Sequence, residues 1–252
     1  MNGIDAAGAA KPVSDARRVF LTAEWRNLAM LNYEAPPEIL EPLVPAGTEL
    51  DTFDGKHYLS VVGFQFLDTR VKGFRIPFHR EFEEINLRFH VRRREADGVR
   101  RGVVFIKEIV PKRAVAAIAN MLYGEHYKAH PMFHRVDLDN RLVEYGWDSG
   151  GGRELFGLTT EGEPSLPDAG SEAEFITEHY WGYTRVTQSK TREYRVEHPQ
   201  WKVWKAAPHT FEVRVESAYG SDFAPYVHER PASAFVADGS AVSVRAYRTL
   251  PR

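Results

Sequence analysis

The sequence of 252 residues contains no cysteine, so it cannot form disulfide bonds, thiolate metal sites or a thiol nucleophile. It has no window of about 18 uncharged apolar residues that would predict a membrane-spanning helix. Residues 1–14 are rich in Ala and Gly and lack the positive and then apolar pattern of a signal peptide. We therefore expect a cytoplasmic protein with no membrane association, in which residues 1–18 form a flexible tail.

Neither sign of charge dominates, because 33 basic side chains are balanced by 35 acidic ones. No global field therefore attracts the protein to nucleic acid. A local patch is formed by the arginines at 92–94 and 100–101, which we expect at a hairpin tip. They lack the interleaved aromatic residues typical of single-strand binding, so we interpret the tip as solvated and expect no nucleic-acid partner.

Three Asp-Gly pairs lie between runs with β-strand composition: Asp54-Gly55, Asp97-Gly98 and Asp238-Gly239. Such pairs favour two-residue hairpin turns, because both residues tolerate a positive φ. Few helices are expected: one beginning at Pro36-Pro37, one over Lys112–Tyr123 and one capped by Ser171. The sequence therefore predicts a mostly β (α+β) fold. Residues 19–252 are expected to form one domain, in which an antiparallel sheet curls into a barrel or cone with helices at its rim.

One predicted strand alternates strictly. Glu84, Asn86, Arg88, His90 and Arg92 face one way, while Ile85, Leu87, Phe89 and Val91 face the other. If Asp97-Gly98 forms the turn, Arg88 lies opposite Lys107 on the next strand. Two opposed cations destabilise a sheet unless an anion lies near them. That anion is Glu84, a carboxylate of another strand or a ligand.

The polar face of this strand has two interpretations. It is either a solvated surface or the lining of the sheet interior. The second is favoured because the expected pairing adds Phe105 and Ile109 to the same face, and a mixture of apolar walls with a few convergent polar groups is typical of a ligand cavity.

Three histidines recur at a spacing of four residues, at His126, His130 and His134. On one helix this spacing presents metal ligands on one face. Pro131 interrupts the segment, however, and no acidic residue completes a known metal signature. We therefore expect neither a metal nor a cofactor.

Four motifs in order resemble the YqjF-like family (DUF2071), distant relatives of acetoacetate decarboxylase. They are Trp25–Tyr33 with the Pro37-Glu38-Ile39-Leu40 and Leu43-Val44-Pro45 that follow, Asp54-Gly55 with its following strand, Phe82–Arg88, and the pair Glu178-His179-Tyr180 and His198-Pro199-Gln200-Trp201. Together they span residues 20–205. The resemblance implies an open, cone-shaped antiparallel β-barrel whose interior holds a small acid.

In the decarboxylases, a Gly-x-Pro-Lys-Lys stretch supplies a lysine that forms a Schiff base and a second lysine that lowers its pKa. Placed on residues 124–128, this stretch puts Tyr127 where the nucleophile would be and Lys128 at the second lysine. The pair of adjacent lysines that the decarboxylases use is therefore missing. A rival placement on Pro111-Lys112-Arg113 copies the letters but lies at a helix start. The resemblance also implies that Glu84 matches the catalytic-site glutamate and Arg26 the substrate-binding arginine.

Two functions follow from this reading. The first is a lyase or isomerase-type enzyme that acts on a small keto or hydroxy acid without an imine, with Glu84, Tyr127 and Lys128 as catalytic residues. Its substrate would be held by four residues: Arg26, Asn86, Arg88 and Lys107. The alternative is a protein that binds or senses a small organic acid without catalysis. The sequence leaves open whether the chain is an enzyme and whether it forms a homo-oligomer.

Overall fold

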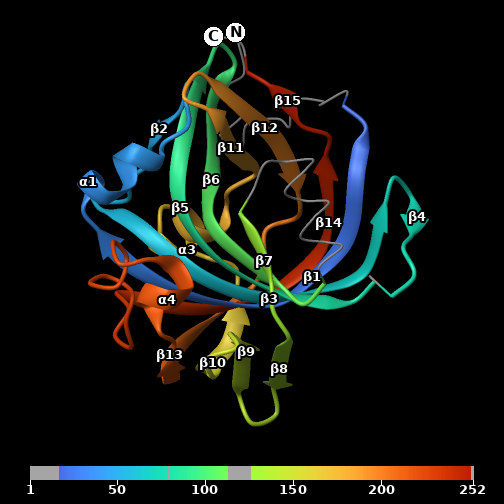
Figure 1. The fold of residues 1–252 in the computed structure, drawn as a ribbon, viewed down its shortest axis with the longest axis vertical. Coiled ribbons are helices and arrows are strands. Elements are labelled where there is room, and N and C mark those ends of the chain that lie inside the picture. The colour runs from blue at the N-terminus through green and yellow to red at the C-terminus, as the bar shows by residue number, and fades with distance from the viewer. Residues whose placement is uncertain (1–16, 79, 113–125, 251–252) are drawn as a thin grey trace, which may run out of the picture.

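The computed structural model describes residues 17–250 apart from residues 79 and 113–125 (Figure 1). Its long strands are β1 (Val19–Ala35), β3 (His57–Val71), β5 (Phe82–Glu95), β6 (Gly98–Val110), β10 (Arg153–Ser165), β13 (Val203–Glu212) and β14 (Ser233–Arg245). Shorter strands are β2 (Glu49–Leu50), β4 (Phe74–Arg75), β7 (Tyr127–Ala129), β8 (Met132–Asp137), β9 (Leu142–Asp148), β11 (Trp181–Thr187), β12 (Lys190–Glu197) and β15 (Arg248–Thr249). The helices are α1 (Pro37–Leu40), η1 (Glu41–Leu43), α3 (Glu172–Thr177) and α4 (Val215–Tyr219). Most of the expected tail and of the expected helix over Lys112–Tyr123 lie outside the described residues.

The described strands form one sheet that closes into a ring. The neighbours in order are β12, β11, β6, β5, β3, β1 and β14, and an additional antiparallel pairing of β12 with β14 completes the circle. Among the described pairings, only β6 with β11 and β6 with β7 are parallel. The prediction of a mostly β fold is confirmed, with the sheet closed as this ring and the helices at its margin (Figure 1).

The main core lies outside the ring. Strands β13, β10, β9 and β8 continue the sheet from β14 and lie below the ring in Figure 1. They cover the apolar face of β5, where Ile85 and Leu87 belong to the same buried cluster as Tyr145 of β9 and Phe156 of β10. Because strand side chains alternate, the opposite face of β5 points into the ring.

A two-residue hairpin turn was predicted at each of the three Asp-Gly pairs, and the structure confirms it at only one of them. Asp54 and Gly55 both have positive φ and form the predicted two-residue turn, closed by a bridge between Phe53 and Lys56. The prediction for Asp238-Gly239 was wrong, because this pair lies inside β14, where Gly239 with φ +86° pairs with Arg26. The chain does not reverse there: the β1–β14 register continues past Gly239, and β1 is irregular between Arg26 and Ala29 only in its pairing with β3.

The β5–β6 hairpin forms, but with a different turn and register. Glu95 pairs with Gly98, so its two-residue loop is Ala96-Asp97. This turn places Arg88 opposite Phe105, and an irregularity in β6 then shifts the pairing by one residue, so that Leu87 lies opposite Lys107. The expected pairing of Arg88 with Lys107 was therefore wrong, and Lys107 lies on the outer face of the sheet with Leu87.

Candidate functional site

A cavity of about 200 Å³ occupies the interior of the ring, and each of its seven strands contributes to the lining. Most of the lining is apolar or aromatic, and a few polar side chains converge on it. The polar and charged lining residues are Thr69, Glu84, Asn86, Arg88, Glu108, Tyr127, Thr177, His179, Tyr194 and His198. Apolar walls with a few placed polar groups are typical of a small-molecule site.

Strand β5 supplies the central polar row. Glu84, Asn86 and Arg88 alternate with apolar residues, and all three line the cavity. The polar face of this strand is therefore the inner face. Asn86 lies opposite Glu108 on β6 and donates a hydrogen bond of 3.1 Å from its Nδ2 to the Glu84 carboxylate.

The Glu84 carboxyl is almost completely buried, with 3% exposure. Burial raises its pKa from 4.5 to about 7, although hydrogen bonds from Asn86 and Tyr127 and the positive charge of Arg88 oppose the rise. A carboxyl group with a pKa near 7 can accept or release a proton at neutral pH, which is the property required of a general acid or base.

Tyr127 reaches Glu84 from the other side of β6. Strand β7 lies parallel to β6, with Tyr127 beside Glu108. The Tyr127 hydroxyl donates a hydrogen bond of 3.1 Å to Glu84 Oε2. Glu108 is itself 1% exposed. Three neighbouring strands thus place two carboxyl groups and one phenol on the same patch of the cavity wall.

Arg88 provides the positive charge of the cavity. It lies deep in the protein, where burial lowers its pKa to about 10, and its remaining accessible surface faces the cavity that it lines. Its Nη2 donates a hydrogen bond of 3.3 Å to the carbonyl oxygen of Ile176. In the described part of the chain no carboxylate forms an ion pair with Arg88, so a bound anion would supply the missing countercharge.

Two histidines of the cavity come from distant segments. His179 follows α3, and His198 follows β12. Burial lowers the pKa of His179 well below its ordinary value and that of His198 to about 4, so both are neutral at pH 7. His179 also lies 4.5 Å, between ring centroids, from the buried His90. Both cavity histidines belong to the family motifs quoted above, which is the signal that could have identified them.

A cluster of aromatic side chains forms another part of the cavity wall. The ring centroid of Trp25 lies 5.2 Å from that of Phe64, 5.6 Å from Phe66 and 6.4 Å from Trp201. His198 stacks on Trp201 with centroids 4.0 Å apart. These residues were not predicted as site residues, because strands distant in the sequence bring them together: Trp25 of β1 pairs with Phe66 of β3, and Trp201 comes from the segment before β13.

Three predicted site residues lie away from this cavity. Arg26 is next to Trp25 but points outward, where it binds the carboxylate of Glu24 at 2.9 Å. Lys128 follows Tyr127 on β7 and lines a different depression of about 120 Å³. Burial and the neighbouring Lys128 lower the pKa of Lys107 on the same outer face. The structure therefore brings together Glu84, Asn86, Arg88 and Tyr127 but not these three cations.

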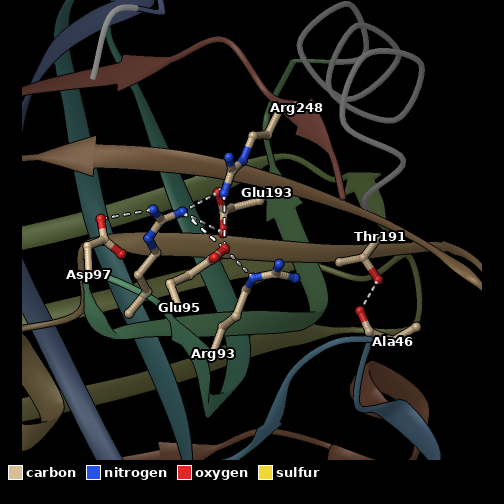
Figure 2. Close-up of polar contacts among 8 residues, drawn as sticks. Ala46, Arg93, Glu95, Asp97, Thr191, Glu193 and Arg248 are labelled. Atoms are coloured by element: carbon tan, nitrogen blue, oxygen red, sulfur yellow. Dashed lines mark hydrogen bonds and ion pairs between the residues drawn. The ribbon is translucent and has the colours of Figure 1, made fainter. Parts of the chain in front are cut away.

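The arginine-rich hairpin tip is not a free basic surface. Arg93 and Arg100 contact Glu95, and Arg100 also reaches the buried Glu193 at 3.2 Å (Figure 2). Arg248 near the C-terminus donates to the same Glu193 at 2.7 Å. Arg92 and Arg94 pair with Glu49, and Arg101 pairs with Asp51. These ion pairs connect the hairpin tip to β12 and β15.

The three histidines at a spacing of four do not share a helix. His126 precedes β7, His130 lies between β7 and β8, and His134 is within β8, where it contacts Glu83 at 2.7 Å. Within residues 17–78, 80–112 and 126–250, no cluster of three His, Asp or Glu residues is arranged to hold a metal. Over the same ranges, no helix is long and apolar enough to cross a membrane.

The chain matches one protein family over most of its length. This family, DUF2071, is described as "Uncharacterized conserved protein", and the match covers residues 22–241. A segment of 76 residues is 32% identical to "Uncharacterized protein YqjF" of Bacillus subtilis (strain 168). That segment covers 30% of this chain and 31% of the curated relative, so the match spans less than a third of that protein's length.

Several solved structures share the fold. The enduracididine biosynthesis enzyme MppR, complexed with pyruvate, aligns with a TM-score of 0.67 at 12% identity and covers 96% of this chain and 93% of its own. Acetoacetate decarboxylase from Legionella pneumophila aligns with a TM-score of 0.64 at 11% identity and covers 98% of both chains. An acetoacetate decarboxylase-like enzyme from Sphingomonas wittichii RW1 gives 0.61 at 16% identity, covering 97% of this chain and 100% of that one. At these identities the likeness shows the fold alone.

Proposed function

Because this chain belongs to the DUF2071 family, whose fold here is that of acetoacetate decarboxylase-like enzymes, we propose that its cavity binds a small organic acid and acts on it without an imine. The substrate is a keto or hydroxy acid, and the reaction is of the lyase or isomerase type. The proposal includes the cytoplasmic location and the absence of a nucleic-acid partner expected from the sequence.

One observation carries the proposal: the buried Glu84 carboxyl, with a pKa of about 7, accepts a hydrogen bond from Tyr127 in the same cavity as Arg88. A titratable group perturbed by burial and placed in a cavity is a candidate for proton transfer. Arg88 matches a carboxylate, because a guanidinium binds it through two parallel hydrogen bonds. The cavity thus supplies a binding charge and a proton-transfer group four residues apart on one strand.

These groups suffice for a proton-transfer reaction. The Glu84 carboxylate takes a proton from the carbon next to the keto group, and the electron pair of that C–H bond moves toward the carbonyl oxygen. The Tyr127 hydroxyl, whose single O–H points to Glu84 in the structure, turns to donate its hydrogen bond to that oxygen as its negative charge develops. Return of a proton to the same carbon completes an exchange, and protonation of that carbon on its opposite face inverts it, which is an isomerisation. The apolar walls exclude water, which strengthens these electrostatic interactions.

Lysine chemistry is disfavoured by the cavity lining. None of the described lining residues is a lysine, and the sequence has none within residues 113–125. A Schiff base requires a lysine amine at the substrate carbonyl. The fold relative MppR was solved with pyruvate, a keto acid. We carry over only that class of ligand, because the identity is 12%.

The sharpest test is proton exchange followed by NMR in D₂O, with a panel of 2-keto, 3-keto and 2-hydroxy acids. We expect at least one acid to exchange its carbon-bound proton or form a product, and Glu84→Gln to slow this by about 100-fold or more. Tyr127→Phe should slow it less. The matched control is Glu83→Gln, because Glu83 is the adjacent residue and its carboxylate contacts His134 outside the cavity.

Borohydride reduction separates this proposal from imine chemistry. After reduction with each keto acid, mass spectrometry should find the protein mass unchanged. A covalent adduct on any lysine would overturn the imine-free reaction. Acid binding without exchange or product across the panel would instead support the non-catalytic alternative, which needs only the shape of the cavity and the charge of Arg88.

A further inference from the structure

We propose that the natural ligand is an aromatic acid, in which one planar ring carries a short side chain that ends in a carboxylate. This inference rests on the proposed function of the cavity and specifies its substrate class. The size of the cavity, its aromatic wall and the separation of its polar and apolar sides support it independently.

The first argument is volume. The cavity measures about 200 Å³. An apolar protein cavity of about 150 Å³ is known to hold one benzene molecule. The cavity therefore accommodates one six-membered ring with a few additional atoms. A three-carbon acid would leave most of the apolar space unfilled or occupied by water that the walls cannot hydrogen-bond.

The second argument is the composition of the wall. Trp25, Phe64, Phe66 and Trp201 form one contiguous aromatic cluster on the cavity, and His198 stacks on Trp201 with an interplanar angle of 17°. Aromatic rings favour edge-to-face or offset contacts with another ring. His198 is neutral at pH 7 because burial lowers its pKa to about 4, so it adds no second positive charge to this wall.

The third argument is the register of the strands. Glu84 on β5 lies directly beside Phe64 on β3, and Phe66 on β3 lies directly beside Trp25 on β1. Across these three strands the lining changes from carboxyl to aromatic over two strand spacings, about 10 Å. A molecule with a carboxylate near Arg88, a reactive carbon near Glu84 and a ring over β3 and β1 spans this distance.

Three paired residues of neighbouring strands close the apolar end of the cavity. Leu21 on β1 pairs with Val71 on β3 and with Val244 on β14, and all three line the cavity. A larger side chain at Leu21 would fill the space assigned to the ring without touching Glu84 or Arg88. This position therefore distinguishes a bulky ligand from a short one.

Isothermal titration with four probes tests the inference on the full chain: pyruvate, 4-methyl-2-oxopentanoate, phenylpyruvate and the neutral phenylacetone. We expect phenylpyruvate to bind at least about tenfold more tightly than pyruvate, because the ring buries more apolar surface. Leu21→Trp should remove this advantage and leave pyruvate binding within about twofold. Val19→Trp is the control, because Val19 lies on the same strand and is 38% exposed. Val244→Phe serves as a second filling variant if Leu21→Trp does not fold.

The results of the titrations test the aromatic class, the proposed function and the acid site separately. Equal or tighter binding of pyruvate overturns the aromatic class, and so does unchanged phenylpyruvate binding in a folded filling variant. If short acids bind and react while phenylpyruvate does not, the substrate class is wrong but the proposed function stands. If phenylacetone binds and none of the acids does, the proposed acid site itself is wrong.

Discussion

The hydroxyl of Tyr127 donates a hydrogen bond of 3.1 Å to the buried carboxyl of Glu84, across the strand that separates them. The two residues lie 43 positions apart in the chain. Tyr127 is a donor to the ionised carboxylate, so it lowers a pKa that burial raises. The pKa of about 7 thus reflects a balance between burial and a small set of polar contacts.

Removing the Tyr127 hydroxyl should disturb this balance. In Tyr127→Phe the ionised carboxylate loses a hydrogen-bond donor, so the pKa of Glu84 should rise above about 7. Carboxyl-carbon NMR titration of glutamate-labelled protein measures this directly, with Glu84→Gln identifying the resonance. Tyr180→Phe is a matched control, because the Tyr180 hydroxyl donates to Glu178 instead. A Glu84 pKa that falls in Tyr127→Phe would contradict the role assigned to the hydrogen bond.

Glu84 should make folding stability fall as the pH rises. Its folded pKa of about 7 exceeds the unfolded value of 4.5, so the folded state binds more protons between these values. Its contribution is fully present below pH 4.5 and is lost as the pH rises through about 7. Glu84→Gln should therefore increase the free energy of unfolding above pH 7 by up to about 3 kcal/mol, relative to its effect at pH 4. Urea denaturation of variant and wild type at a series of pH values measures the difference.

The neighbouring glutamate provides a control of opposite sign. The hydrogen bond with His134 lowers the pKa of Glu83, so its contribution is present above the unfolded pKa and is lost as the pH falls. Glu83→Gln should therefore decrease stability at pH 7. Glu84→Gln and Glu83→Gln should therefore change the free energy of unfolding with opposite pH dependence. The same pH dependence in both variants would contradict the opposite pKa shifts assigned to the two carboxyl groups.

Strand alternation predicted a large part of the site. The alternation from Glu84 to Arg92 placed Glu84, Asn86 and Arg88 on one face, and the structure brings these three to the cavity. Lys107 was misplaced because the irregularity in β6, which turns its side chain to the other face, leaves no signal in the sequence. The apolar and aromatic wall could not be predicted, because Trp25 and Trp201 are far apart in the sequence and meet beside Ser240 of β14, which pairs with Trp25 and accepts a hydrogen bond from Trp201.

Alternation also explains two of the misplaced cations. Arg26 follows Trp25, and Lys128 follows Tyr127; in each pair the aromatic residue lines the cavity. Adjacent residues of a strand point to opposite faces, so each cation points outward once its neighbour is inward. The family resemblance supplied their chain positions but not the direction of their side chains.

Replacement of Arg88 should separate binding from stability. Arg88 is half-buried, burial lowers its pKa to about 10, and it forms no ion pair within the described ranges, so its charge is costly to the folded state. Arg88→Met, of similar length, should leave the free energy of unfolding unchanged or raise it by about 1–2 kcal/mol. The same variant should weaken binding of a carboxylate ligand by about 100-fold or more, because the charged hydrogen bonds are lost. Titration calorimetry and urea denaturation check the two effects, and a parallel loss of stability would contradict this account.

Glu193 should be a strong stabiliser of the hairpin tip. Its carboxylate is completely buried and accepts hydrogen bonds from Arg100 and Arg248 (Figure 2). In Glu193→Gln both guanidinium groups lose their buried countercharge and share only the partly exposed Glu95, which should cost about 2–4 kcal/mol. Asp97→Asn is the control, because Asp97 also contacts Arg100 but its side chain is 43% exposed. We expect the control to cost less than about 1 kcal/mol in urea denaturation. Equal losses in the two variants would show that burial of Glu193 is not the deciding factor.

Gly239 is the position at which the ring is least tolerant of a side chain. It has φ +86° inside β14, and a Cβ atom there would lie 2.0 Å from the carbonyl oxygen of Trp25. Gly239→Ala must therefore move two paired backbones apart beside the aromatic wall, in addition to the cost of a left-handed conformation. We expect the free energy of unfolding to fall by more than about 3 kcal/mol, with weaker ligand binding because Trp25 shifts.

Gly150→Ala is the control for the conformational cost alone. Gly150 has φ +81° with nothing within 4 Å of the added Cβ, so this variant should lose only about 1 kcal/mol of stability. Thermal and urea denaturation of the two variants measures the difference. A Gly239→Ala variant as stable as Gly150→Ala would mean that β1 and β14 move apart at this position without loss of stability.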